Sequence, residues 1–135
     1  MATILPTGRV TGKTYIASGD LSAAQFHIVQ LSAASTAAIA GAGSKCLGVL
    51  KNKPASAGGG SASVVTRGET EVYVDAGTAI LIGDRIMSDS SGHGVKVPAT
   101  AATIKEYLGI AMEAKASGTG TIIVDVLPGS TTYTT

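Results

Sequence analysis

The chain has 135 residues, of which 44% are hydrophobic and only 14% are charged, and its formal net charge is +1. This length corresponds to a single domain, and the basic residues are scattered singly, which excludes the concentrated positive surface of nucleic-acid-binding or acidic-membrane-binding proteins. A surface with so little charge is poorly protected against association, which favours a protein that works within an assembly.

The first 15 residues have little periodicity and contain Pro6, Gly8 and Gly12. Two interpretations remain open: a frayed end, or an arm that orders only on a partner. An arm would have side chains to bury, namely Ile4, Leu5, Arg9, Val10 and Tyr15. The start lacks the charged residues and long apolar run of a signal peptide, and no apolar stretch reaches transmembrane length, so we expect a soluble protein made in the cytoplasm.

The segment Gly8–Thr14 resembles a phosphate-binding loop but is one residue short between its glycines. Such a loop needs a buried strand before it and a helix after it, so that backbone N–H groups surround the phosphate. Too few residues precede Gly8 for a strand, and Tyr15-Ile16 favours extended structure. We therefore expect no nucleotide site and no cofactor.

Strand signals dominate the rest of the chain, at Phe26–Leu31, Glu71–Asp75 and Thr121–Leu127. The 18 glycines punctuate these runs at short intervals, which is typical of a barrel or sandwich. We predict an all-β fold, a small β-barrel or β-sandwich of short strands, with minor helical turns at Leu21–Gln25 and Thr100–Glu106. For Ala33–Ala40 a loop is favoured over a helix. We divide the chain into an arm (1–15), a barrel (16–128) and a polar tail (129–135), for which disorder is favoured.

An internal repeat is the most informative pattern. A Gly-Asp pair precedes each half, at Gly19 and at Gly83, and each half contains a Leu-Gly-β-branched strand followed by a Gly-rich hairpin. A glycine within a strand marks a bend or a close backbone approach. We therefore expect Gly48 and Gly109 to let their strands curl into a small barrel.

No candidate site shows the pattern of an enzyme or a metal protein. Cys46 is the single cysteine, and its apolar neighbours predict a buried, inert thiol. The two histidines, His27 in an apolar strand and His93 in a turn, show no metal-ligand spacing. A Ser-His-Asp triad depends on geometry that counting residues does not test, but no Gly-x-Ser-x-Gly elbow occurs.

The order of these segments resembles the capsid cement, or head decoration, family of tailed bacteriophages. The resemblance covers about Gly19 to Leu127, and Val65–Val74 is similar to the family's central hairpin. The family's remaining pattern is matched by Gly83-Asp84-Arg85-Ile86-Met87, Leu108-Gly109-Ile110-Ala111, Ala116-Ser117-Gly118 and Ile122-Ile123-Val124-Asp125-Val126.

The resemblance implies a barrel subunit that forms a homotrimer on the outer surface of the virion, at threefold or quasi-threefold positions. Its partner would be the major capsid protein, whose expanded shell it would stabilise, with no catalytic residues, cofactor, nucleic acid or membrane involved. The alternatives are another virion component (tail, baseplate or head fibre) and, less favoured because aromatic residues are few, a host- or carbohydrate-binding β module.

Overall fold

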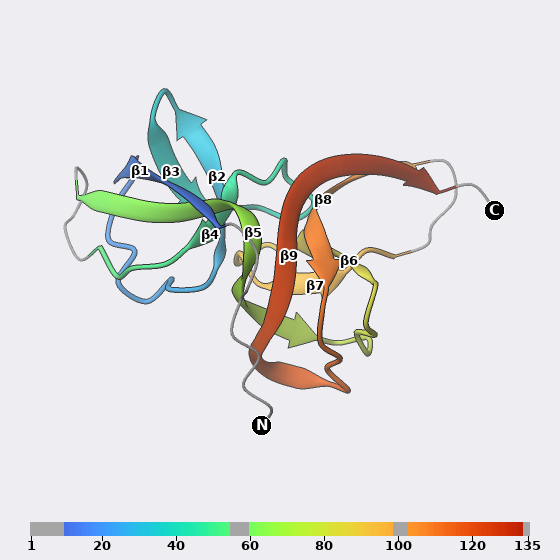
Figure 1. Ribbon diagram of the computed structural model, residues 1–135. Helices are drawn as coiled ribbons and strands as arrows, with labels where there is room; N and C mark the ends of the chain where they lie inside the picture. Colours follow the sequence, from blue (N-terminus) through green and yellow to red (C-terminus); the bar gives the residue numbers. More distant parts are fainter. Residues whose placement is uncertain (1–9, 55–59, 99–102, 134–135) are drawn as a thin grey trace.

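The computed structural model describes residues 10–54, 60–98 and 103–133, and all their regular structure is β (Figure 1). The nine strands are β1 (Thr11–Ala17), β2 (Ile28–Ala33), β3 (Thr36–Ile39), β4 (Gly48–Leu50), β5 (Ser61–Ala76), β6 (Arg85–Ser88), β7 (Gly94–Lys96), β8 (Thr103–Ala111) and β9 (Gly118–Tyr133). No helix occurs in these ranges, and they therefore contain no helix that could cross a membrane. The predicted all-β class is confirmed.

Five strands close a mixed barrel in the order β5, β7, β6, β8, β9 and back to β5. The pair β5–β7 is parallel and the other four pairs are antiparallel. The four remaining strands lie outside this barrel. Together with the first half of β5 they close a second ring in the order β1, β3, β2, β4, β5, with β1–β3 as its one parallel pair.

The two rings have the same pattern of pairings, which confirms the internal repeat. Equivalent turns also carry equivalent backbone hydrogen bonds: the Phe26 amide donates to the Leu50 carbonyl at 2.7 Å, and the Gly83 amide donates to the Ala111 carbonyl at 2.8 Å. Gly83 therefore corresponds in space to Phe26 and not to Gly19. The paired Gly-Asp dipeptides of the sequence are not structural counterparts.

Strand β5 belongs to both rings (Figure 1). Residues 61–67 pair with β1, and residues 68–76 pair with β9. Gly68, where the change occurs, has φ 102°, a conformation that side chains disfavour. The glycine thus allows one 16-residue strand to leave the first ring and enter the second.

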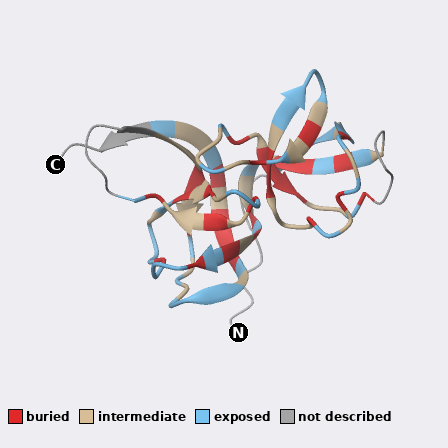
Figure 2. Cartoon of the chain, turned by 180° about the vertical axis from the view of Figure 1, so that it is seen from behind, coloured by how far each residue is buried: buried red, intermediate tan, exposed pale blue. Residues whose placement is uncertain are grey.

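The core is built from small and branched aliphatic side chains and is continuous between the units (Figure 2). Ile28, Cys46 and Val49 of the first unit belong to the same buried cluster as the side chains of the second barrel, such as Val72 and Ile86. A separate cluster fills the first ring. Because the units share buried surface as well as a strand, they form one domain.

Several local predictions of helix, loop or disorder were wrong. The segment Thr100–Glu106, predicted to be helical, enters strand β8 at Thr103, and Ala33–Ala40 is mostly a hairpin whose turn is Ala34-Ser35. Leu21–Gln25 forms turns without a helix. Residues 129–133 of the expected disordered tail continue β9 and pair with β8. In all of these segments except Leu21–Gln25, strand pairing overrides local propensity.

Gly48 and Gly109 occupy equivalent places and have the same steric role. A Cβ atom at Gly48 would collide with the carbonyl oxygen of Val65, and one at Gly109 would collide with that of Asp125. Both collisions involve backbone atoms of the adjacent strand, which cannot rotate away. The expected close approach at these glycines is therefore present in both units.

We predict that Gly109→Ala destabilises the protein by about 1–3 kcal/mol or more, because the backbone of β9 must shift. The matched control is Gly77→Ala, where an added Cβ meets nothing within 4 Å. Urea denaturation measures both variants. Equal midpoints for the two would contradict the close-approach interpretation.

Cys46 is buried and free, as predicted. Burial, with a smaller contribution from the Glu106 carboxylate, raises the pKa of the thiol to about 12. Only about one thiol in ten thousand is then ionised at pH 8, and the thiolate is the reactive form. We expect negligible reaction with a chromogenic disulfide reagent at pH 8 in the folded protein and rapid reaction in urea. Rapid reaction of the folded protein would contradict this assignment.

Candidate functional site

The residues expected in a partner-binding arm divide into three groups. Ile4, Leu5 and Arg9 lie outside the described residues. Val10 directly precedes β1, and its side chain is 48% exposed. Tyr15 lies within β1 and packs, partly buried, against the core cluster of the first ring. The first ring thus begins at Thr11, and Tyr15 is a part of it.

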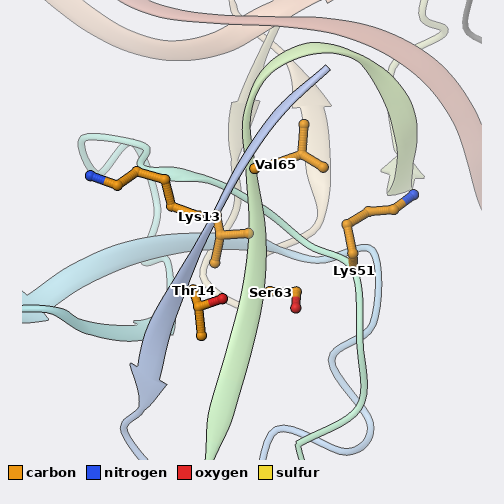
Figure 3. A pocket seen from close by; sticks show the side chains of 7 residues that line it. Lys13, Thr14, Lys51, Ser63 and Val65 are labelled. Atoms are coloured by element: carbon orange, nitrogen blue, oxygen red, sulfur yellow. The ribbon is translucent and has the colours of Figure 1, made fainter. Parts of the chain in front are cut away.

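Within the segment that resembles a phosphate-binding loop, the part from Thr11 onward is extended, as expected. Gly12, Lys13 and Thr14 lie in β1 and pair with Val65, Val64 and Ser63 of β5. They line a shallow hollow in which the Lys13 and Lys51 side chains point away from each other (Figure 3). Without a helix N-terminus or converging cations, this hollow has none of the features that hold a phosphate.

The structure brings both histidines together, which sequence spacing did not predict. The rings of His27, Tyr73 and His93 form a cluster in which each ring contacts the other two, with centroid separations of 4.9–5.2 Å. His27 comes from the first unit, whereas Tyr73 and His93 come from β5 and from the loop after β6. The rings line an open hollow together with polar residues such as Gln25 and Lys53.

The backbone beside this ring cluster is strained. Phe26 has φ 68°, an unfavourable value for a bulky residue, at the position where the second unit has Gly83 with φ 93°. The conformation is held because the Tyr73 amide donates to the Phe26 carbonyl at 2.8 Å, and the Lys51 ammonium lies 5.0 Å from the centroid of the Phe26 ring. The hydrogen bond from Tyr73 joins the two units, whereas the contact with Lys51 lies within the first unit.

The ring cluster lacks the nucleophile of a catalytic triad. His93 Nδ1 lies 3.4 Å from Asp89 Oδ2, which resembles the histidine–carboxylate half of a triad. The nearby Ser88 is fully buried, and its hydroxyl is directed to the Ala40 and Asp89 carbonyls. Across the described ranges, no serine hydroxyl is hydrogen-bonded to either histidine, so nothing there prepares an attack on a substrate.

The largest apolar exposure lies at one end of the second barrel. We name Leu81, Ile82 and Met112, which are 58%, 71% and 40% exposed, the apolar end. Their segments run side by side. The Gly83 amide donates to the Ala111 carbonyl, and the backbone amides of Ile80 and Lys115 each donate to the carbonyl of the other residue. Clusters of exposed apolar side chains are common at the interaction sites of soluble proteins.

Comparison with known proteins agrees with this reading of a binding surface without catalytic chemistry. A protein-family model described as "Phage cement protein" matches residues 5–126. No curated protein matches the chain significantly. The chain therefore belongs to the phage cement protein family, and membership implies a generally non-enzymatic structural protein of the virion that binds and stabilises the capsid.

Proposed function

We propose that this protein binds the outer surface of the expanded capsid as a homotrimer, at threefold or quasi-threefold positions, and bridges neighbouring subunits of the major capsid protein. The observation that carries this function is the family match over residues 5–126. A ligand that binds only the mature lattice stabilises it by mass action, by about 2.7 kcal/mol per site when its free concentration is 100 times Kd. Three linked copies add avidity without new contacts.

The apolar end supports this proposal, because the internal repeat provides a comparison within one molecule. Gln25 and Lys51 of the first unit occupy the positions of Ile82 and Met112 in the second, as the equivalent hydrogen bonds around Phe26 and Gly83 establish. The Gln25 amide donates to the Lys51 carbonyl at 3.0 Å. Polar residues therefore suffice for the fold at these positions, and the exposed apolar residues of the second unit are explained by a partner.

We assign the capsid shell as the partner of the apolar end. Three side chains cannot provide the roughly 800 Å² per partner that a stable pairwise complex buries, so this surface alone would not hold two free copies together. It is sufficient as one of several contacts made at once on a repeating lattice. The absence of strong net charge fits the same role, since little charge must be desolvated on docking.

The segment before β1 is the second proposed contact. Ile4, Leu5 and Arg9 precede Val10, whose exposed side chain stands where the chain enters the barrel. An arm that orders on the shell would bury these side chains at a cost in chain entropy. Tyr15 serves this arm by anchoring β1 in the first ring.

We predict that the purified protein binds expanded shells of the major capsid protein and ignores unexpanded ones. Light scattering after size-exclusion chromatography should give three times the chain mass. Cosedimentation with each type of shell measures binding. A strictly monomeric protein that binds neither type of shell would contradict the proposed function. Binding to isolated tails alone would favour a tail component.

Replacement of Ile82 by Gln, the residue type at the equivalent position of the first unit, should weaken shell binding at least about tenfold without changing the melting temperature. The reason is the lost burial of an aliphatic side chain, about 1.5–3 kcal/mol. The matched control is Leu31→Gln, an exposed leucine of β2. Equal shell occupancy for the two variants would show that the apolar end does not face the shell.

A variant lacking residues 2–9 should fold normally, because the barrel begins after these residues. We expect it to occupy fewer sites on expanded shells, since its side chains no longer contribute to binding. Circular dichroism checks the fold, and densitometry of purified particles measures occupancy. Unchanged occupancy would show that the segment is only a chain end.

A further inference from the structure

The loop between β6 and β7 holds Asp89 in a fixed orientation. Asp89 Oδ1 accepts hydrogen bonds from the backbone amides of Ser91 and His93, at 2.8 and 3.0 Å. The second oxygen, Oδ2, is thereby turned toward Nδ1 of His93, which lies 3.4 Å away.

Strand register brings a second carboxylate to the same place. Val74 of β5 pairs in parallel with Gly94 of β7, so Tyr73 lies opposite His93, and Asp75, two residues further along β5, is on the same face of that strand as Tyr73. One ligand atom from each of Asp75, Asp89 and His93 lies within 4.8 Å of the other two. Among the residues that the structure describes, no donor or cation is paired with the Asp75 carboxylate. Two carboxylates thus approach one imidazole with no neutralising partner for Asp75.

The His93–Asp89 separation is long for a hydrogen bond and fits two ligands of one metal ion. A charge-assisted N–H···O bond is about 2.7–2.9 Å long, clearly shorter than the 3.4 Å between His93 and Asp89. Two ligands of a tetrahedral zinc ion, each about 2.1 Å from the metal, are themselves about 3.4 Å apart. The His93–Asp89 distance therefore equals the edge of such a tetrahedron.

The first unit shows that the fold does not need these residues. Its β2–β3 hairpin turns with two residues, Ala34 and Ser35, whereas residues 89–93 connect β6 to β7. Ser18 occupies the position of Asp75, because Ala17 pairs with Ala37 as Val74 pairs with Gly94. The three ligand groups are found only in the second unit.

We propose that Asp75, Asp89 and His93 bind a divalent transition-metal ion, with Zn²⁺ as the ion that the donor set fits best. An imidazole nitrogen favours Zn²⁺ over Ca²⁺ or Mg²⁺, which prefer oxygen ligands. His93 would bind as the neutral ring with its proton on Nε2. A fourth position would remain for water.

The ion would connect β5 to a loop that also contacts the first unit. The Gly92 carbonyl in this loop accepts a hydrogen bond from the Ile28 amide at 2.8 Å. A metal ion that fixes the loop against β5 would therefore stabilise the junction of the two units, and its binding free energy would add to the free energy of unfolding.

The test is calorimetric titration of the full chain with Zn²⁺, after treatment with a chelator and its removal. We expect one saturable site per chain, a higher melting temperature with zinc, and no comparable binding of Ca²⁺ or Mg²⁺. Asp75→Asn should weaken zinc binding at least about tenfold, because that is the smallest loss typical of removing a supporting partner of a metal ligand. Because the Asp75 side chain is exposed and unpaired in the described structure, its zinc-free melting temperature should not fall.

The matched control is Glu71→Gln, an exposed carboxylate on the same strand that is not in the group, and it should bind zinc as the unaltered protein does. Absence of saturable binding to the unaltered chain would overturn the proposal. Equal zinc affinity of the Asp75→Asn variant would overturn the proposal as well, because histidine side chains would then bind zinc without the help of Asp75. Neither outcome depends on capsid binding.

Discussion

The structure depends on one strand that must serve two rings. Each ring closes only through β5, whose first half pairs with β1 and β4 and whose second half pairs with β7 and β9. Val64 is buried in the core of the first ring, and Val72 and Val74 are buried in the core of the second. Displacing β5 would open both rings at once, so the stability of either unit includes that of the other.

The sequence predicted those parts of the fold that local periodicity controls. Alternation around Val72 and Val74 indicated a half-buried strand, and the doubled Leu-Gly unit indicated two equivalent strands with tight backbone contacts. It could not predict the parallel pairs β1–β3 and β5–β7, because these pairings join residues far apart in sequence and have no local signal. Pairing with the distant strand β9 likewise makes Thr103–Glu106 part of β8, where a helix was predicted.

The candidate sites were harder to predict for a related reason. His27 and His93 meet only because Val74 pairs with Gly94, and the conformation of Phe26 is evident only from its correspondence with Gly83. The exposure of Leu81 and Ile82 is evident only from the structure. A phosphate-binding loop at Gly8–Thr14 was disfavoured from sequence alone, because the segment is one residue short between its glycines.

Ring closure also bears on how a protein with so few charges can remain dispersed before it assembles. Each described strand has a neighbour on both sides somewhere along its length, so most of the backbone offers no free edge to which another chain could add a strand. Several stretches nevertheless pair on one side only, namely Thr11–Thr14 of β1, Gln30–Ala33 of β2 and the ribbon in which Thr103–Tyr107 pairs with residues 129–133 and which extends away from the barrel (Figure 1). Pro128, which lacks an N–H donor, stands where this ribbon leaves the ring. Within the described chain, unwanted association through backbone pairing is confined to stretches that pair on one side only, and contacts elsewhere must be made by side chains, whose complementarity determines the partner.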